Sequence, residues 1–266
     1  MKLYLVRNKI EVSFILLQTI LYGIFLNFDI ADVNAVLSCR IKFGIILVCF
    51  CYVIIYCKGR KFLCNSAYNR SIIFCMIVGL LFTVISDFFI LILDHYIYGV
   101  ITFIIVQQLY GIRIIMTDKN KWDGEDEQIR KRTPNNIFTY KYLLRVIFEL
   151  ITAFSVCIIL KLCGVVLEVL LVISVFYFVC ITTNAITAVR AVVHNPKKKE
   201  NLLFAVGMVL FLFCDINVGI FNMSGYISMP EQLYHVLYAV SSILMWTFYA
   251  PAQVLISLSV SRMCKY

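Results

Sequence analysis

The chain has 266 residues, of which 62% are hydrophobic and only 15% are charged, and its formal net charge is +9. Soluble domains carry about 25% charged residues, so a chain this apolar could not cover its own surface with polar groups in water. The composition excludes an ordinary water-soluble globular protein. The basic residues lie in short stretches beside apolar runs, which is typical of a topology signal, so we expect no nucleic-acid partner.

A helix that crosses the bilayer needs about 20 mostly apolar residues. The first half of the chain holds four such runs, at residues 11–28, 40–57, 71–93 and 96–116. The second half holds four more, at residues 142–161, 164–189, 201–221 and 234–259. These runs are continuous and lack the alternation of barrel strands. We therefore predict a single all-α domain over residues 1–266, a membrane bundle of about eight helices.

A polar segment, residues 117–141, joins the two sets of four helices and is expected to form a cytoplasmic loop. With eight helices, 21 of the 24 Lys and Arg residues fall on the side that holds both termini. Cytoplasmic loops of membrane proteins are rich in Lys and Arg, so we predict that both termini are cytoplasmic.

Two acidic residues lie inside apolar runs, Asp87 in the third helix and Asp215 in the seventh. An ionisable group within the membrane is costly unless it is partnered or faces water, so it marks a candidate functional site. Each aspartate follows a glycine by eight positions, Gly79 and Gly207 respectively. The two helices also hold the same place in each set of four. This pattern predicts a parallel internal repeat of four helices, as in some transporters.

Both helices run in the same direction, which puts Asp87 and Asp215 at about 24 and 21 Å from the predicted cytoplasmic end. If the helices are neighbours, the two carboxyl groups can face one cavity. Two nearby carboxyl groups in a medium of low dielectric constant cannot both ionise easily. A neutral acid beside a carboxylate is the arrangement that general acid/base catalysis uses. The alternative is that both aspartates only form hydrogen bonds between helices.

Other polar residues on the apolar helices predict a polar-lined interior. The candidates for contact with a substrate are Ser86, Gln107, Tyr110, Asn184, Tyr249 and Gln253. Any one of them alone could equally serve to bond helices together. The histidines and the 11 cysteines show no metal-ligand spacing. We therefore expect no metal or other cofactor.

Four segments of the chain together resemble the YhhN family, the group that contains the lysoplasmalogenases. They are residues 81–87, 99–110, 207–215 and 247–256. Both aspartates are retained. The chain departs from the family at Gln107, where a histidine is usual, at Ser86, where a glycine is frequent, and at Cys214, where a serine is common.

The resemblance implies an integral protein of a bacterial cell membrane that hydrolyses the vinyl-ether bond of lysoplasmalogens, a class of lysophospholipid. The products would be a fatty aldehyde and a glycerophospho-alcohol, and Asp87 and Asp215 would be the catalytic pair. A vinyl ether is hydrolysed by protonation of its β-carbon, which needs an acid, and a nearby carboxylate can stabilise the resulting cation and activate water. The alternatives are a non-enzymatic lipid or proton-coupled transporter and a structural membrane protein.

Overall fold

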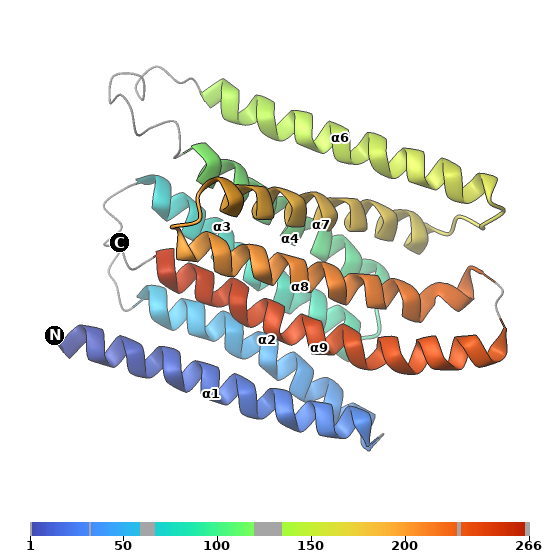
Figure 1. Cartoon of the computed structure of the whole chain (residues 1–266), viewed down its shortest axis with the longest axis horizontal. Coiled ribbons are helices and arrows are strands. Elements are labelled where there is room, and N and C mark those ends of the chain that lie inside the picture. The colour runs from blue at the N-terminus through green and yellow to red at the C-terminus, as the bar shows by residue number, and fades with distance from the viewer. Residues whose placement is uncertain (1, 32, 59–66, 120–134, 228–229, 264–266) are drawn as a thin grey trace.

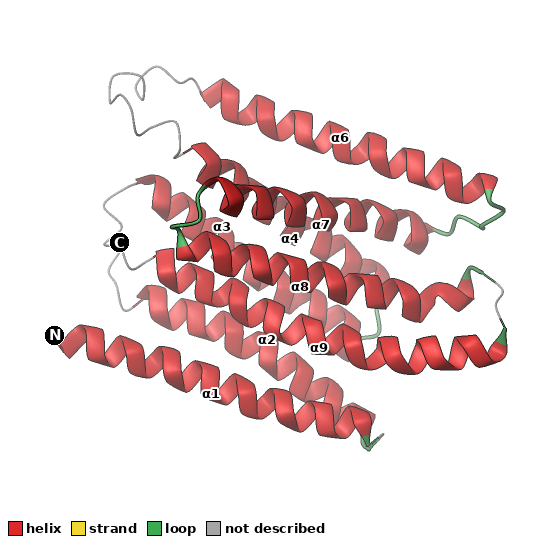
Figure 2. Ribbon diagram, in the orientation of Figure 1, coloured by secondary structure: helices red, strands yellow, loops and turns green. Residues whose placement is uncertain are grey.

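The computed structural model describes residues 2–31, 33–58, 67–119, 135–227 and 230–263 (Figure 1). The helices of the first half are α1 (Lys2–Ile30), α2 (Ala35–Lys58), α3 (Ala67–Asp87), the π-helical turn η1 (Phe88–Ile92) and α4 (Tyr96–Lys119). Those of the second half are α6 (Asn135–Leu162), α7 (Val169–His194), α8 (Lys199–Asn222), the short 3-10 turn η3 (Met223–Gly225) and α9 (Glu231–Met263). Figure 2 shows that the described elements are helices joined by short loops.

The structure confirms the predicted all-α class, and within the described residues eight helices are long and apolar enough to cross a membrane. The predicted loop at 117–141 is partly wrong, because α4 continues to Lys119 and α6 already begins at Asn135. The charged residues between these helices, 120–134, lie outside the described part of the chain. Polar residues at the ends of both helices extend the helical backbone beyond the apolar runs.

The boundary between α6 and α7 also differs from the prediction, since a helix was expected over 164–189. Gly164 has a φ of +85°, which only glycine adopts without strain. The Val165 N–H turns back to the Leu160 carbonyl at 3.0 Å, the bond that closes a Schellman cap. Residues 165–168 are not helical, and α7 begins at Val169.

Six of the helices form a closed ring. In order around the ring, α2 packs against α3, α3 against α4, α4 against α7, α7 against α8, α8 against α9, and α9 against α2. The two remaining helices pack outside this ring, α1 against α2 and α9, and α6 against α4 and α7. Figure 1 shows α1 and α6 on opposite flanks of the bundle, with both termini at one end. We call that end the terminal end.

The helix contacts agree with the predicted repeat. When each helix of the first four is exchanged with its counterpart in the second four, the contacts α3–α4 and α8–α9 are interchanged, as are α4–α7 and α9–α2. The outer contacts behave in the same way, since α1 lies against α2 and α9 while α6 lies against α7 and α4. This is the contact pattern expected for two parallel four-helix units related by a pseudo-twofold axis along the bundle.

The two equivalent glycines both allow helices to approach closely. A Cβ atom on Gly79 would lie 2.9 Å from the ring of Tyr110 in α4. A Cβ atom on Gly207 would lie 2.8 Å from Ile256 and 3.0 Å from the Ala252 carbonyl in α9. Small residues of this kind are the usual means of close helix packing in membranes. Each glycine thus allows close packing with the next helix, and an aspartate follows about two turns further along the same helix.

Candidate functional site

Asp87 lies at the last position of α3, where the helix changes into the π-helical turn η1. π-helical turns occur often at functional sites. The Asp87 side chain is 3% exposed, and the Tyr249 hydroxyl of α9 donates a hydrogen bond of 2.7 Å to its Oδ2 atom. This bond joins α3 to α9, which flank α2 in the ring, and so holds the carboxyl group inside the ring.

Tyr249 lies two residues before a proline in the middle of α9. Pro251 lies inside this helix and has no N–H group, so the carbonyl of Thr247 loses its helical partner. The Tyr22 hydroxyl of α1 donates to that carbonyl at 3.2 Å. Pro251 therefore frees an acceptor that bonds α1 to α9 two residues before Tyr249.

Asp215 has a tyrosine partner as well. The Tyr177 hydroxyl of α7 donates a hydrogen bond of 2.7 Å to Asp215 Oδ2. Tyr177 is buried and Asp215 is partly buried. Tyr177 was not among the candidates from sequence. In the sequence Tyr177 is a tyrosine within an apolar run, and many other tyrosines of the chain have the same setting.

The two tyrosine–aspartate pairs are linked through Phe103 of α4. The Phe103 ring centroid lies 5.8 Å from that of Tyr177 and 6.4 Å from that of Tyr249. Phe211 of α8 completes the cluster, at 5.8 Å from Phe103 and 5.2 Å from Tyr249. The two carboxyl groups are therefore attached to one aromatic cluster inside the ring of helices. The Cys214 thiol, beside Asp215 in sequence, lies near the carboxyl groups of both Asp87 and Asp215.

Gln107 and Asn184 form a second polar contact beside this cluster. The Asn184 amide donates to both the backbone carbonyl and the side-chain Oε1 of Gln107, each at 2.8 Å. Both residues are fully buried. The Gln107 Nε2 atom faces Tyr177, and no acceptor among the described residues bonds to it in regular hydrogen-bond geometry. The structure thus brings these two predicted candidates together next to the Tyr177–Asp215 pair.

A buried ion pair that was not among the predicted site residues lies behind Asn184. The Arg145 Nε atom lies 2.8 Å from Oε1 of Glu149 one turn along α6, and its NH2 group donates to Asn184 Oδ1 at 2.6 Å. Glu149 is fully buried and also accepts from Gln108 at 2.9 Å. Arg145 and Glu149 both lie within the helix predicted at residues 142–161, but their pairing was not among the predictions. An acid four residues after an arginine in an apolar run is a signal that could have been read.

The remaining candidates have different environments. The Ser86 hydroxyl donates to the Gly99 carbonyl at 2.5 Å and so bonds α3 to α4. Both polar atoms of the Gln253 amide are buried with no hydrogen-bond partner among the described residues, and the buried Tyr110 hydroxyl lacks a regular hydrogen bond there. Ser86 thus has a packing contact, while Tyr110 and Gln253 keep free polar atoms in the interior.

The geometry leaves one oxygen of each carboxyl group available. Tyrosine hydroxyls bond to the Oδ2 atoms, and no donor from the described residues bonds to either Oδ1 atom. A carboxyl group oriented in this way can hold a proton, a water molecule or a substrate oxygen on its second atom. In the part of the chain that the structure describes, no three His, Cys, Asp or Glu side chains are arranged to hold a metal ion.

Comparison with known proteins gives one match. The model of the family described as the YhhN family matches residues 37–260, which cover α2 to α9. Neither the curated proteins nor the solved structures contain a significant match to this chain.

Proposed function

The chain belongs to the YhhN family, and we propose that it is a membrane hydrolase that cleaves the vinyl-ether bond of lysoplasmalogens with Asp87 and Asp215. One observation carries the proposal. Two carboxyl groups, each oriented by a tyrosine hydroxyl at 2.7 Å, meet one aromatic cluster inside a closed ring of helices. Neither aspartate forms a salt bridge with a described residue, so both carboxyl groups remain free to take part in a reaction.

The reaction requires one acid and one carboxylate. The neutral carboxyl group donates its proton to the β-carbon of the vinyl ether, and the ether oxygen shares the positive charge that forms on the α-carbon. The second group, as a carboxylate, stabilises this cation and takes a proton from the water that attacks it. The hemiacetal then returns a proton to the first group and receives one on the leaving oxygen from the second. The aldehyde and the glycerophospho-alcohol are released, and both carboxyl groups regain their starting states.

The surroundings of the site suit a lipid with one hydrocarbon chain. Phe103, Phe211 and the tyrosine rings give the cluster an apolar surface. The Gln107 amide beside Tyr177 offers a free N–H donor for an oxygen of the glycerol or the ether. We propose further that the terminal end of the bundle is cytoplasmic, because 21 of the 24 basic residues fall on that side, and that the membrane is a bacterial cell membrane.

The test is aldehyde release from lysoplasmenylethanolamine by the purified protein in detergent. Asp87→Asn and Asp215→Asn should each abolish release while the protein stays folded, because an amide neither donates a carboxylic proton nor carries the charge of a carboxylate. Asp94→Asn is the matched control. Asp94 is exposed in the turn before α4 with a φ of 59°, a conformation that asparagine tolerates. Full activity of either site variant would exclude the assignment.

A second function, proton-coupled transport of a lipid, is favoured by the parallel repeat, since carriers are often built in this way. The aspartates would then bind the coupling proton. Product formation in detergent requires no gradient, whereas transport requires a sealed vesicle. Uptake into vesicles without aldehyde formation would favour the transporter.

A further inference from the structure

A line of polar side chains runs along α9 from Asp87 towards the terminal end of the bundle. It consists of Tyr249, Gln253, Ser257 and Ser261, which recur every four residues and so follow one face of the helix in a slow spiral. Their exposed fractions are 4%, 0%, 0% and 1%. At 1.5 Å per residue the line is about 18 Å long. It begins at the residue that bonds Asp87, so it connects the proposed site with the terminal end.

Among the described residues, several polar atoms along this line lack a hydrogen bond of regular geometry. They are Nε2 and Oε1 of Gln253 and three hydroxyls, those of Ser257, Tyr110 and Tyr52. Each of these hydroxyls has only a side-chain contact outside regular hydrogen-bond geometry, with Cys49, Thr83 and Ser261 respectively. Buried polar atoms are almost always hydrogen-bonded, and leaving one unbonded costs free energy. Bound water is the usual partner of such atoms when several polar groups surround it. Five polar atoms along one line that lack a regular hydrogen bond therefore indicate a row of water molecules.

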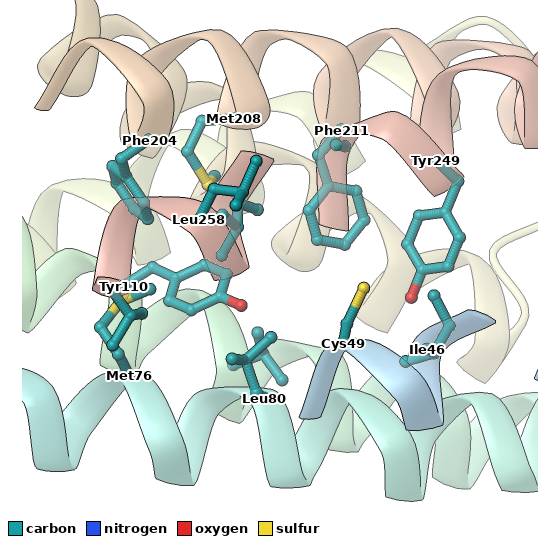
Figure 3. Packing of buried hydrophobic residues seen from close by; sticks show 14 of the residues in the cluster. Ile46, Cys49, Met76, Leu80, Tyr110, Phe204, Met208, Phe211, Tyr249 and Leu258 are labelled. Carbon is teal, nitrogen blue, oxygen red and sulfur yellow. The ribbon is translucent and has the colours of Figure 1, made fainter. Parts of the chain in front are cut away.

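Polar side chains of α2 lie beside successive members of this line on α9. The Cys49 thiol of α2 lies beside Ser257, and Tyr52, one turn further along α2, lies beside Ser261. Gln18 of α1 donates to the Cys49 sulfur at 3.3 Å. Figure 3 shows the Cys49 thiol and the hydroxyls of Tyr110 and Tyr249 directed into the middle of the bundle. Polar groups thus approach the line from α1, α2 and α4.

The line reaches a charged pair at the terminal end. Arg262, next to Ser261, pairs with Glu11 of α1, and its side chain is 34% exposed. Tyr52 lies near both of these charged side chains. The polar line therefore leads from a partly exposed ion pair to the buried Asp87 carboxyl group.

We propose that Gln253 and Ser257 hold a file of water molecules that connects Asp87 with the aqueous phase at the terminal end. This inference rests on the proposed function, because each vinyl ether that is hydrolysed consumes one water molecule. The lipid substrate resides in the bilayer, so its own entry route brings no water. A separate polar path through the ring of helices supplies it. Gln253 and Ser257 are positioning residues on this path, since they act on water and not on the lipid.

The path is tested by radiolytic hydroxyl-radical labelling of the full-length protein in detergent, read by mass spectrometry. Radicals form from water, so a buried side chain is labelled only where it touches bound water. We expect Tyr52 and Tyr110 to be labelled several-fold more, relative to the unfolded protein, than Phe204 and Phe211, which are equally buried. Equal protection of all four aromatic side chains would overturn the proposal.

The combined variant Gln253→Leu with Ser257→Ala removes the polar atoms from the middle of the path. Labelling of Tyr110 should fall to the level of Phe204, and aldehyde release should slow at unchanged KM. The control is Ser241→Ala on the same helix, where the buried hydroxyl already bonds to the Leu237 carbonyl at 2.6 Å. Unchanged Tyr110 labelling in the combined variant would contradict the path. If that variant does not fold, the wild-type pattern decides.

The two proposals fail in different ways. Labelling of Tyr52 and Tyr110 without any aldehyde release would retain the water file and reject the hydrolase. Aldehyde release with protected tyrosines would retain the hydrolase and reject the water file.

Discussion

Tyr249 and Asp87 are 162 residues apart in the sequence, yet the tyrosine hydroxyl donates to the aspartate at 2.7 Å. Tyr177 and Asp215 repeat this pairing at the same distance, but with a different choice of helices. Asp87 is bonded from α9, the last helix of the other half, whereas Asp215 is bonded from α7 in its own half. The contacts of the helices follow the internal repeat, but the hydrogen bonds of the aspartates do not. Two carboxyl groups in unlike surroundings are suited to unlike roles in one reaction.

Tyr249→Phe and Tyr177→Phe should each lower kcat for aldehyde release by about 10- to 100-fold. A hydrogen bond to a charged group contributes about 1.5–3 kcal/mol, and each 1.4 kcal/mol corresponds to about tenfold in rate. The measurement is steady-state hydrolysis by purified protein. Tyr22→Phe is the control, because its hydroxyl bonds only to the Thr247 backbone outside the site. A site variant that behaves like Tyr22→Phe would mean that the tyrosine does not orient the carboxyl group.

Glu149→Gln should destabilise the protein by about 3–5 kcal/mol, because it leaves the Arg145 guanidinium buried without its counter-ion. The combined change Arg145→Met with Glu149→Leu should cost clearly less, since no charge stays unpaired. The measurement is thermal unfolding in detergent. Lys161→Met, an exposed change at the end of the same helix, should have little effect. A combined variant less stable than Glu149→Gln would show that the pair contributes more than charge neutralisation.

Gly79→Ala and Gly207→Ala should each lower stability by about 1–3 kcal/mol, since overpacking a buried contact forces neighbours to shift. The added methyl group would lie 2.9 Å from Tyr110 in the first case and 2.8 Å from Ile256 in the second. Gly219→Ala is the matched control in α8, where no atom lies within 4 Å of the added Cβ. That variant should be neutral or more stable by up to about 1 kcal/mol. Equal unfolding midpoints for all three variants would contradict the close packing.

Arg113→Lys should destabilise the terminal end of the ring although it keeps the charge. The Arg113 guanidinium is 2% exposed and stacks on Phe204 with its Cζ atom 3.6 Å from the ring centroid. Lysine has no planar group to stack, so about 1–2 kcal/mol of cation–π stabilisation should be lost. Arg190→Lys at an exposed position is the control. Unfolding midpoints of the two variants should differ, and coinciding midpoints would reject the stacking contribution.

The helices could be predicted because each is encoded locally. Continuous apolar runs of sufficient length have one stable form in lipid, in which the backbone bonds to itself. The paired motif of Gly79 and Asp87 with Gly207 and Asp215 predicted the repeat for the same reason, since equivalent helices carry equivalent residues. The errors lie where the local signal is weak. Gly164 ends α6 through its backbone conformation, and hydropathy does not record this.

The candidate site was predictable only in part. Asp87 and Asp215 could be found because a charged group in an apolar run is rare and costly. Tyr177 and Glu149 were missed for different reasons. A tyrosine gains its role only from the residue that its hydroxyl reaches. Glu149 lies close to a basic segment and was overlooked among the charges there.

The sequence by itself determined that this protein lies in a lipid membrane, that it is all-α, which family it resembles and where its two intramembrane aspartates are. Composition and local pattern are enough for each of these. Only the tertiary structure decided the partners of those residues. It joined Asp87 to Tyr249 and Asp215 to Tyr177, and it buried Gln253 and Ser257 with unbonded atoms on one line. Such contacts depend on which helices become neighbours and how each is rotated about its axis. That outcome is set by packing over the whole bundle and by glycines such as Gly79, which no single segment reveals.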